Sequence, residues 1–366
     1  MTNRIWGIGT AVPDKQVEQS DALRMTTDLV CADDSQSRFL RVLFRSSGVE
    51  QRRTVLPWQI GYQWKEESSN GSLGHGPGTA ERMAIYDQLA PQLAEQAARQ
   101  AIADAAIDAN QVTHLITVSC TGFSAPGVDI SLIESLALPQ SVERMHVGFM
   151  GCHAAINAIR IAQAIADSNP QAVILVCAVE LCSLHYRLSW DVEGVKGNAL
   201  FADGAAAMII GGRPIREHGW RIRATGSQLL PDSRDEMSWR IGDHGFEMRL
   251  TSRVPGIIQT HVRDWLARWL AQYQYAVEDV GEWGVHPGGP KIITAVEQAL
   301  KLPEAACDLS REILRTHGNM SSPTVLFLFD QLRKRTQSPI VLLAFGPGLT
   351  AEAALLQPIG EQPESH

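Results

Sequence analysis

Short apolar, β-branched runs alternate along the chain with longer segments in which apolar residues recur every three to four positions. The first pattern is typical of buried strands, and the second is typical of helices with one apolar face. Strands are expected over residues 112–119, 171–179, 204–211 and 339–345, and helices over residues 80–106, 152–167, 255–276, 290–301 and 322–335. The alternation predicts an α/β layered fold whose sheet is covered by helices on both faces.

Two stretches of small residues, 203–210 and 348–356, look like copies of one another. Each predicts a strand that closes one half of the chain. The composition breaks between them at Gly211-Gly212-Arg213-Pro214, a sequence that favours a turn or crossing point. We therefore expect a boundary near residue 212, with an N-terminal half over 1–212 and a C-terminal half over 213–366.

Composition and charge restrict the class of protein. The 366 residues include 45% hydrophobic and 20% charged residues, which excludes the disordered classes. The six cysteines form no CxxC pair, so neither a disulfide framework nor a metal site is expected. A net charge of −8 argues against a nucleic-acid partner. Without a long apolar run or a signal-peptide core, we expect no membrane partner and a cytoplasmic location.

Cys152 is the first candidate for chemistry. It follows an apolar strand pattern and Gly151, and it is expected to open the helix over 152–167. A helix N-terminus favours a thiolate, because unpaired backbone amides and the positive end of the helix dipole lie beside it. These features predict a nucleophile with a depressed pKa. On position alone, a small residue packed between strand and helix explains Cys152 equally well.

Two further polar residues are fixed by rigid neighbours. His286 ends a strand and is followed by Pro287-Gly288-Gly289-Pro290, which starts a helix. Asn319 lies in a tight turn before another helix, with Ser322 as the expected N-cap and Pro323 at the first helical position. Alone, each is more simply a structural histidine or a turn-forming asparagine. Together with Cys152 they favour a catalytic group.

These residues stand in strings that resemble one enzyme family. The strings are Leu200-Phe201-Ala202-Asp203-Gly204-Ala205-Ala206-Ala207, His286-Pro287-Gly288-Gly289-Pro290, Gly318-Asn319-Met320-Ser321-Ser322 and Phe345-Gly346-Pro347-Gly348-Leu349-Thr350. Over nearly the whole chain they resemble the type III polyketide synthases of the bacterial, chalcone synthase-like type, in the thiolase superfamily. The resemblance implies a thiolase-like αβαβα fold of two duplicated halves, a homodimer, and a buried cavity reached by a CoA-binding tunnel.

The resemblance also implies roles for the three residues. Cys152, in the N-terminal half, would take the starter acyl group from an acyl-CoA and hold the growing chain, and His286 would pair with it as imidazolium. His286 and Asn319, in the C-terminal half, would bind the thioester oxygen of malonyl-CoA as carbon dioxide leaves. The substrates are CoA thioesters, and no further cofactor is implied.

Other positions match the cavity of the family. Phe201 matches an aromatic gate, and Met248 stands where plant members carry a second aromatic ring. Cys120, Glu180 and Ser321 match a cavity-lining set that influences cyclisation. Cys120 replaces a threonine, and a thiol is the weaker hydrogen-bond donor. Ala344 departs from the usual glycine of its loop.

The CoA phosphates require a local basic group in this acidic chain. The best cluster comprises Arg41, Arg45, Arg52 and Arg53, although a solvated surface explains it about as well, since Glu50 interrupts the run.

Met248, Ala125 and Cys120 predict a pliable apolar cavity that takes medium to long alkyl starters in preference to coumaroyl-CoA. The expected products are alkylpyrones or alkylresorcinols, with pyrones favoured. A ring of Trp239 inside the cavity would instead restrict it to short starters. Two alternatives stay open: a priming β-ketoacyl-acyl carrier protein synthase, and a non-catalytic thiolase-fold binding subunit.

Overall fold

One sheet of nine strands runs through the molecule, a computed structural model that describes residues 3–68, 75–212 and 219–359. The strand order is β11-β12-β13-β8-β1-β7-β6-β4-β5. The bounds are β1 Arg4–Ala11, β4 His114–Ser119, β5 Glu143–Gly148, β6 Val173–Leu181, β7 Asp203–Gly211, β8 Gly219–Leu229, β11 Glu282–Val285, β12 Ile340–Gly346 and β13 Thr350–Ile359. The expected boundary adjoins residues 213–218, which lie outside the described residues.

The sheet consists of two similar sets of strands. In the first set the small-residue strand β7 lies antiparallel between β6 and β1, and in the second β13 lies antiparallel between β12 and β8. The sets join only where β1 meets β8, through the pairs Arg4–Arg221 and Ile5–Trp220. The two small-residue stretches are therefore equivalent strands, as their likeness in sequence predicts.

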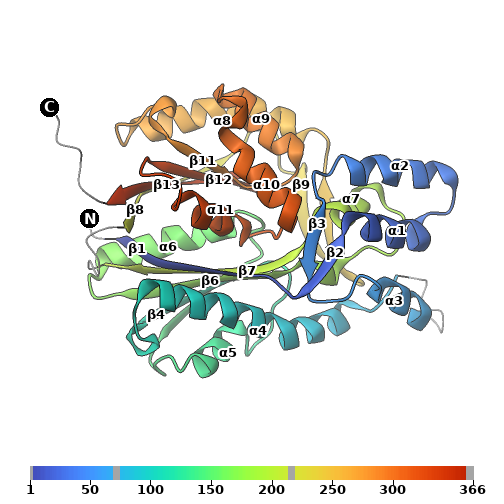
Figure 1. Ribbon diagram of the computed structural model, residues 1–366, viewed down its shortest axis with the longest axis horizontal. Coiled ribbons are helices and arrows are strands. Elements are labelled where there is room, and N and C mark those ends of the chain that lie inside the picture. Colours follow the sequence, from blue (N-terminus) through green and yellow to red (C-terminus); the bar gives the residue numbers. More distant parts are fainter. Residues whose placement is uncertain (1–2, 69–74, 213–218, 360–366) are drawn as a thin grey trace.

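Helices cover both sets and fill the space between them (Figure 1). α6 (Ala154–Ser168) and α11 (Thr324–Leu332) lie in the middle layer. The outer layers are formed by α4 (Thr79–Ala105) and α5 (Val128–Ser135) on one side and by α8 (Val254–Ala271) and α9 (Pro290–Leu300) on the other. This is the expected thiolase-like αβαβα arrangement.

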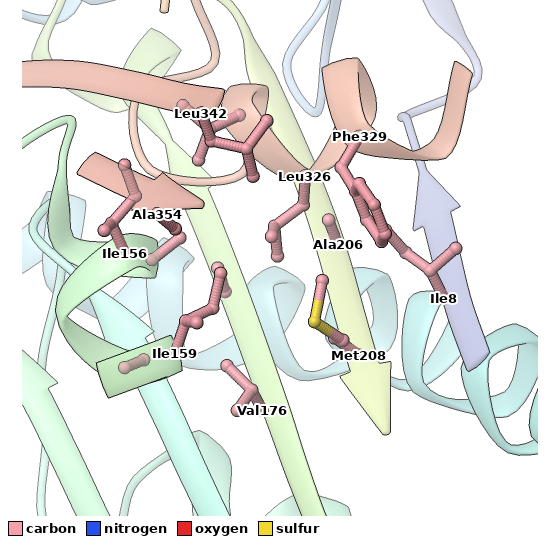
Figure 2. Close-up of a cluster of buried hydrophobic side chains, with 14 of the residues drawn as sticks. Ile8, Ile156, Ile159, Val176, Ala206, Met208, Leu326, Phe329, Leu342 and Ala354 are labelled. Carbon is pink, nitrogen blue, oxygen red and sulfur yellow. The ribbon is translucent and has the colours of Figure 1, made fainter. Parts of the chain in front are cut away.

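The central core is built from both halves of the chain. Figure 2 shows Ile156 and Ile159 of α6 close to Leu326 of α11, with Leu342 and Ala354 reaching in from the second set of strands. All five side chains are fully buried. Separate apolar clusters lie under α4 and under α8 and α9, so each set of strands is buried on both faces.

The first outer layer depends on close contact between β1 and α4. A Cβ atom at Gly7 would lie 2.4 Å from the carbonyl oxygen of Ala101, and one at Gly9 would lie 2.3 Å from that of Ala97. Glycine on the strand and alanine on the helix therefore bring the two backbones into contact.

The remaining elements gather at one end of the molecule (Figure 1). They include the β2–β3 pair, three helices and the β9–β10 hairpin, whose bounds are β2 Lys15–Glu18, β3 Gln51–Thr54, α1 Gln19–Val30, α2 Asp34–Arg45, α7 Val192–Leu200, β9 Met237–Gly242 and β10 Gly245–Leu250. Two other helices, α3 (Ile60–Ser68) and α10 (Asp308–His317), complete the α-helices of the described chain. Within the described residues, no helix is long and apolar enough to cross a membrane.

The predicted strands and long helices are confirmed, but two helix starts are wrong. α6 begins at Ala154, so Cys152 lies in the preceding turn. α11 begins at Thr324 with Pro323 as the residue before it, and Ser322 is not its N-cap. The hydroxyl of Ser322 donates instead to Glu180 at 2.6 Å. In both cases, residues expected to cap a helix form a turn before it.

Candidate active site

Cys152 lies in the short turn between β5 and α6. The turn contains two residues with positive φ, Phe149 at 59° and Gly151 at 83°. A Cβ atom at Gly151 would lie 2.5 Å from Cδ of Pro347, so the turn presses against the loop between β12 and β13. Cys152 is half-buried, as is Cys31, whereas the other four cysteines are buried.

His286 follows β11 directly. Its backbone N–H donates to the carbonyl of Leu343 at 2.8 Å, which continues the parallel pairing of β11 with β12. The side chain is 1% exposed, and within the described residues neither ring nitrogen has a hydrogen-bond partner. Buried polar groups normally have a partner, so an unbonded imidazole is a candidate for contact with a substrate.

Asn319 is fixed by its backbone and by its side chain. Its N–H donates to the carbonyl of Leu200 and its carbonyl accepts from the N–H of Ala202, both at 2.9 Å. The side-chain Oδ1 accepts from the N–H of Ser321 at 2.8 Å, which leaves the Nδ2 protons free to donate elsewhere. The backbone pairing flanks Phe201, so Asn319 and Phe201, the predicted gate residue, are held together.

The three predicted catalytic residues meet in one cavity of about 440 Å³. Most of its remaining wall is apolar, and the lining residues are Cys152, Leu200, Phe201, Met237, Met248, Leu250, His286, Gly288, Ile292, Asn319 and Phe345. Each catalytic residue comes from a different segment, since one lies in the turn before α6, one after β11 and one after α10. The fold therefore brings together residues that are far apart in the sequence.

Burial has the largest effect on the pKa values of Cys152 and His286. It raises the pKa of Cys152 to about 11, while hydrogen bonds from Ser321 and Asn319 act in the opposite direction. Burial lowers the pKa of His286 to about 3, with a smaller effect from His153. The expectation of a depressed thiol pKa and an imidazolium partner is thus wrong for the substrate-free site. The helix begins two residues after Cys152, and desolvation favours the neutral forms of the thiol and the imidazole.

A second cavity of about 400 Å³ lies on the other side of Cys152 and includes Cys120 and Ser321 in its wall. Behind it Glu180 is fully buried. Its carboxylate accepts from the hydroxyls of Thr121 and Ser322, both at 2.6 Å, and from the thiol of Cys120 at 3.3 Å. Burial raises the pKa of Glu180, and these donors oppose the shift. Glu180 therefore holds the cavity wall from behind.

The β9–β10 hairpin supplies the outer wall of both cavities. Trp239 and Met248 are directly paired across it. The indole Nε1 of Trp239 donates to the carbonyl of Cys120 at 2.6 Å, and its ring contacts Phe246 edge to face at 5.9 Å. The ring of Trp239 is therefore fixed inside the cavity region, whereas Met248 beside Phe201 is unbranched and adaptable.

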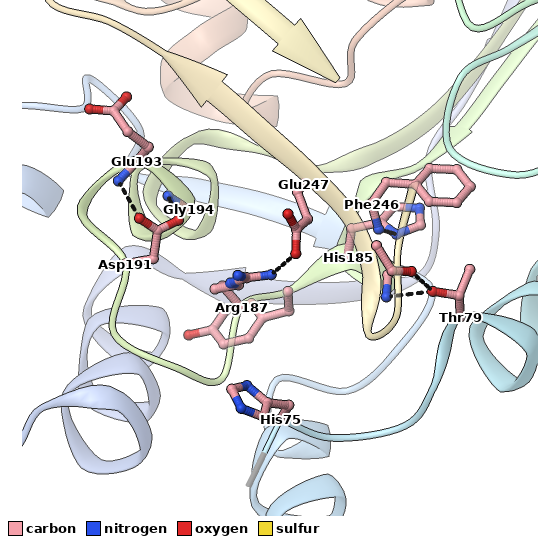
Figure 3. Close-up of polar contacts among 12 residues, drawn as sticks. His75, Thr79, His185, Arg187, Asp191, Glu193, Gly194, Phe246 and Glu247 are labelled. Atoms are coloured by element: carbon pink, nitrogen blue, oxygen red, sulfur yellow. Dashed lines mark hydrogen bonds and ion pairs between the residues drawn. The ribbon is translucent and has the colours of Figure 1, made fainter. Parts of the chain in front are cut away.

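A third cavity of about 820 Å³ shares Cys182, Phe201, Trp239 and Met248 with the second. Its largely apolar wall includes Val17, Ala22, Met25, Leu56, Trp58 and Ile60. Figure 3 shows its rim, where Arg187 pairs with Glu247 at 2.9 Å and Phe246 stacks on His185. The second and third cavities are thus neighbours that share part of their walls, and the third extends to this rim.

The predicted arginine cluster is divided. Arg41 and Arg45 are exposed on α2, and Arg53 is half-buried, with its guanidinium donating to the carbonyl of Asp14 at 2.8 Å. Arg52 is 4% exposed, and both of its terminal nitrogens donate to protein oxygens, among them the carbonyls of Asn198, Ala199 and Phe201. A phosphate role for Arg52 is therefore wrong, because its guanidinium already supports the end of α7.

His153, the residue after Cys152, joins segments from both halves of the chain. Its imidazole is within hydrogen-bond distance of Asn157 Oδ1 at 2.7 Å and of Thr350 Oγ1 at 3.1 Å. The Thr350 hydroxyl donates in turn to the carbonyl of Pro347. The residue after the nucleophile thus ties its turn to the loop from the other half. Thr350 is 197 positions from His153 in the sequence, so no local pattern could reveal that contact.

Comparison with known proteins decides the family. The sequence model of the chalcone and stilbene synthases matches residues 2–214 with its N-terminal domain and residues 221–360 with its C-terminal domain. The chain belongs to the chalcone and stilbene synthase family. These enzymes are acyltransferase-type condensing enzymes, the type III polyketide synthases, as the sequence motifs predict.

Relatives are similar in sequence to this protein over almost its whole length. A 1,3,6,8-tetrahydroxynaphthalene synthase of Streptomyces peucetius subsp. caesius is 32% identical over 96% of this chain and 92% of its own. The alpha-pyrone synthesis polyketide synthase-like Pks18 of Mycobacterium tuberculosis is 30% identical over 96% of this chain and 90% of its own.

Solved structures agree as well. The type III domain of Steely1, a type I/III hybrid from Dictyostelium, has a TM-score of 0.91 at 25% identity and covers 98% of this chain and 100% of that chain. PKS-I from the brown alga Ectocarpus siliculosus has a TM-score of 0.87 at 27% identity, covering 97% and 98%.

The geometry predicts that His286 controls the reactivity of Cys152. Iodoacetamide should modify Cys152 at pH 7 about tenfold more slowly in His286→Gln than in the wild type, because glutamine cannot take the thiol proton. Half-buried Cys31 is an internal control whose rate should not change. Peptide mapping over time measures both rates. Equal rates at Cys152 would show that His286 does not activate it, and preferential labelling of Cys177 or Cys182 would contradict their burial.

Proposed function

We propose that this enzyme loads an acyl-CoA starter on Cys152 and extends it with malonyl-CoA by decarboxylative Claisen condensation. The observation that carries the proposal is the unbonded, buried His286 beside Asn319 and Cys152 in one cavity. The family match favours this reaction over that of a priming β-ketoacyl-acyl carrier protein synthase. CoA thioesters and six unpaired cysteines fit a cytoplasmic location.

Loading begins with proton transfer from Cys152 to His286. The transfer creates an ion pair, and the mutual attraction of its charges offsets part of the cost of burying them. The thiolate then attacks the starter carbonyl, the bond to the CoA sulfur breaks, and CoA leaves with the proton. His286 returns to its neutral form, which burial favours.

Extension uses His286 again, now together with Asn319. Neutral His286 and the Nδ2 protons of Asn319 hydrogen-bond the thioester oxygen of malonyl-CoA. The bond between the malonyl carboxylate and the α-carbon breaks, carbon dioxide leaves, and the charge moves to that oxygen as an enolate. The enolate carbon attacks the acyl carbon on Cys152, the bond from that carbon to Sγ breaks, and the Cys152 thiolate leaves while the extended chain stays on CoA. Because the donors are fixed beforehand, they stabilise the charge as it forms, and loss of one typically costs about 10²–10³ in rate.

Separate roles for loading and decarboxylation give the main test. Cys152→Ala should abolish polyketide formation and keep malonyl-CoA decarboxylation, whereas His286→Ala should impair both. Liquid chromatography with mass spectrometry of acetyl-CoA and of polyketide products measures the two steps. Normal product formation by Cys152→Ala would overturn the proposal, because the reaction would then not need the thiol. Full activity of His286→Ala would overturn its assigned role.

For the starter, we propose a medium to long alkyl chain and an alkylpyrone product. Trp239 takes up space beside Cys152, but the third cavity continues beyond it between largely apolar walls. An alkyl tail could follow the pliable side of Met248 into that space, with each buried methylene contributing about 0.8 kcal/mol. The pyrone agrees with the name of the Pks18 relative, an alpha-pyrone synthesis polyketide synthase-like protein. It also fits Cys120, a weak donor for activating the water that aldol-type closure needs.

Gly197 allows this path to be blocked. A Cβ atom there would lie 3.4 Å from the ring of Phe201 and 3.8 Å from the end of Met248. A larger side chain would therefore fill the space beside these two residues. The ratio of kcat/KM for lauroyl-CoA to that for acetyl-CoA should fall about tenfold in Gly197→Leu, the equivalent of losing two methylenes. The control is Gly256→Leu on α8, where nothing lies within 4 Å.

The wild type should also prefer lauroyl-CoA to hexanoyl-CoA, acetyl-CoA and coumaroyl-CoA in a kcat/KM series. A preference for coumaroyl-CoA, or no gain with chain length, would show that this account of the cavity is wrong.

For CoA itself, we propose a rim of Arg41, Arg45 and Arg53, extended by Lys291. A Cβ atom at Gly48 would lie 2.9 Å from Pro290, so the turn after α2 lies against the start of α9. Arg45 and Lys291 are both exposed near this contact, and neither makes an ion pair within the described chain. This arrangement supports a phosphate site beside the cavity that holds Cys152.

We also propose that the chain is divided into two halves near residue 212.

We propose that the enzyme is a homodimer through the face around Phe149. Phe123 and Met150 are 50% and 42% exposed there, and Phe123 contacts the ring of Phe149. The patch continues past Pro347 and Gly348 to Leu229, which is 61% exposed. β5, the last strand of the sheet, leads directly into it, so an apolar patch adjoins an open sheet edge.

Leu229→Glu should shift the protein from dimer to monomer, because a charge would be buried in the apolar contact. Sedimentation velocity measures the change, and Ile241→Glu is the control on another exposed apolar residue, 56% exposed on β9. A wild type that sediments as a monomer would contradict the proposal.

A further inference from the structure

One face of α2 has properties that go beyond the phosphate binding proposed for Arg41 and Arg45. Its inner face, with Leu40 and Phe44, is buried in the apolar cluster that includes Val195 and Ala199 of α7. Its outer face carries Arg38, Arg41, Val42 and Arg45, spaced three, one and three residues apart. These positions lie on one side of a helix, so three guanidinium groups surround an apolar side chain.

The outer face is apolar as well as basic. Val42 is 69% exposed and Phe39 is 38% exposed, with its ring edge to face against Trp190 at 5.8 Å. Val192, at the start of the neighbouring helix α7, is 42% exposed. These are three of the seven large hydrophobic side chains exposed in the described part of the chain. Exposed apolar residues ringed by charge mark a surface for a partner.

The charge of this face opposes that of the whole protein. The chain carries a net charge of −8, yet the three arginines make no ion pair within the described residues. The acidic groups on the same helix are Asp33, whose carboxylate caps its first turn and is influenced by Arg38, and Asp34. A basic face on an acidic protein attracts an acidic partner and orients it on approach.

The face lies close to the catalytic cavity. The turn after α2 packs against Pro290 through Gly48, and Val49 lies in a cluster with Leu200. Leu200 is part of the wall of the cavity that contains Cys152. Figure 1 shows α2 beside α7, the helix that ends at Leu200. A partner bound along α2 therefore lies close to the wall of the cavity that contains Cys152.

We propose that this face, formed by Arg38, Phe39, Val42 and Val192, docks a small acidic carrier protein that delivers the starter on its phosphopantetheine arm. The proposal rests on the proposed function, because the arm is the same group that CoA presents. Cys152 would attack the carrier-bound thioester, the bond between the acyl carbon and the pantetheine sulfur would break, and the carrier thiol would leave with the proton held by His286. The carrier's acidic surface would meet the arginines, and its apolar residues would cover Val42 and Phe39.

The test compares two donors of one acyl group. Dodecanoyl-loaded fatty-acid acyl carrier protein and dodecanoyl-CoA serve as starters with malonyl-CoA, and kcat/KM is measured for each. Arg38→Glu and Val42→Glu should lower kcat/KM for the carrier-bound starter about tenfold and change that for dodecanoyl-CoA less than about twofold. Arg268→Glu, an exposed arginine on α8, is the control and should change neither. Added salt should weaken only the carrier reaction.

Each other outcome has a defined meaning. If the wild type uses dodecanoyl-CoA but not the carrier-bound starter, the docking proposal fails and the polyketide synthase proposal stands. If it uses neither starter nor any other acyl-CoA, the proposed function itself fails. Equal losses with both donors would add Arg38 and Val42 to the CoA site proposed for Arg41 and Arg45. Arg38-dependent binding to phosphatidylglycerol vesicles, with an unchanged carrier reaction, would make it a membrane surface. Either of these results would overturn the proposal.

Discussion

The backbone pairing of Asn319 with the residues on either side of Phe201 holds the active site together. Two hydrogen bonds of 2.9 Å join a turn of the C-terminal region to the end of α7 in the N-terminal region. They set the position of the amide relative to the gate, and the hydroxyl of Ser322, three residues further on, reaches Glu180. Backbone hydrogen bonds are well suited to this purpose, because their geometry depends little on side-chain rotamers.

The hairpin adds a second, more adaptable constraint. Trp239 is fixed by its bond to Cys120, whereas Met248 directly opposite has no polar anchor. A rigid and a flexible wall thus face the same space. In such a cavity the rigid side sets what is excluded, and the flexible side sets how far an accepted chain can extend. The proposed selection of starters therefore depends on Trp239 and Met248 together.

Patterns of apolar and small residues predicted the layered fold because each buried strand or helix carries its own periodicity. The runs that became β6 and β12 are almost entirely apolar, and the likeness of β7 and β13 reflects equivalent places in the sheet. The motif resemblance identified Cys152, His286 and Asn319, and the structure places all three in one cavity. It could not reveal their charge state, which depends on burial by distant segments. The start of α6 after Cys152 and the contact of His153 with Thr350 were hidden for the same reason.

Arg52 matters for the site even though it does not bind phosphate as predicted. Its guanidinium binds three carbonyls at the end of α7, where the helix dipole is negative and the last carbonyls lack partners. Burial lowers the pKa of Arg52 only to about 10, so the cation persists at neutral and acidic pH. Lysine would keep the charge but lose the planar fork that reaches several oxygens at once. The position of Phe201, whose carbonyl Arg52 binds, should therefore not change with acidity, although the proposed reaction beside it depends on proton transfer.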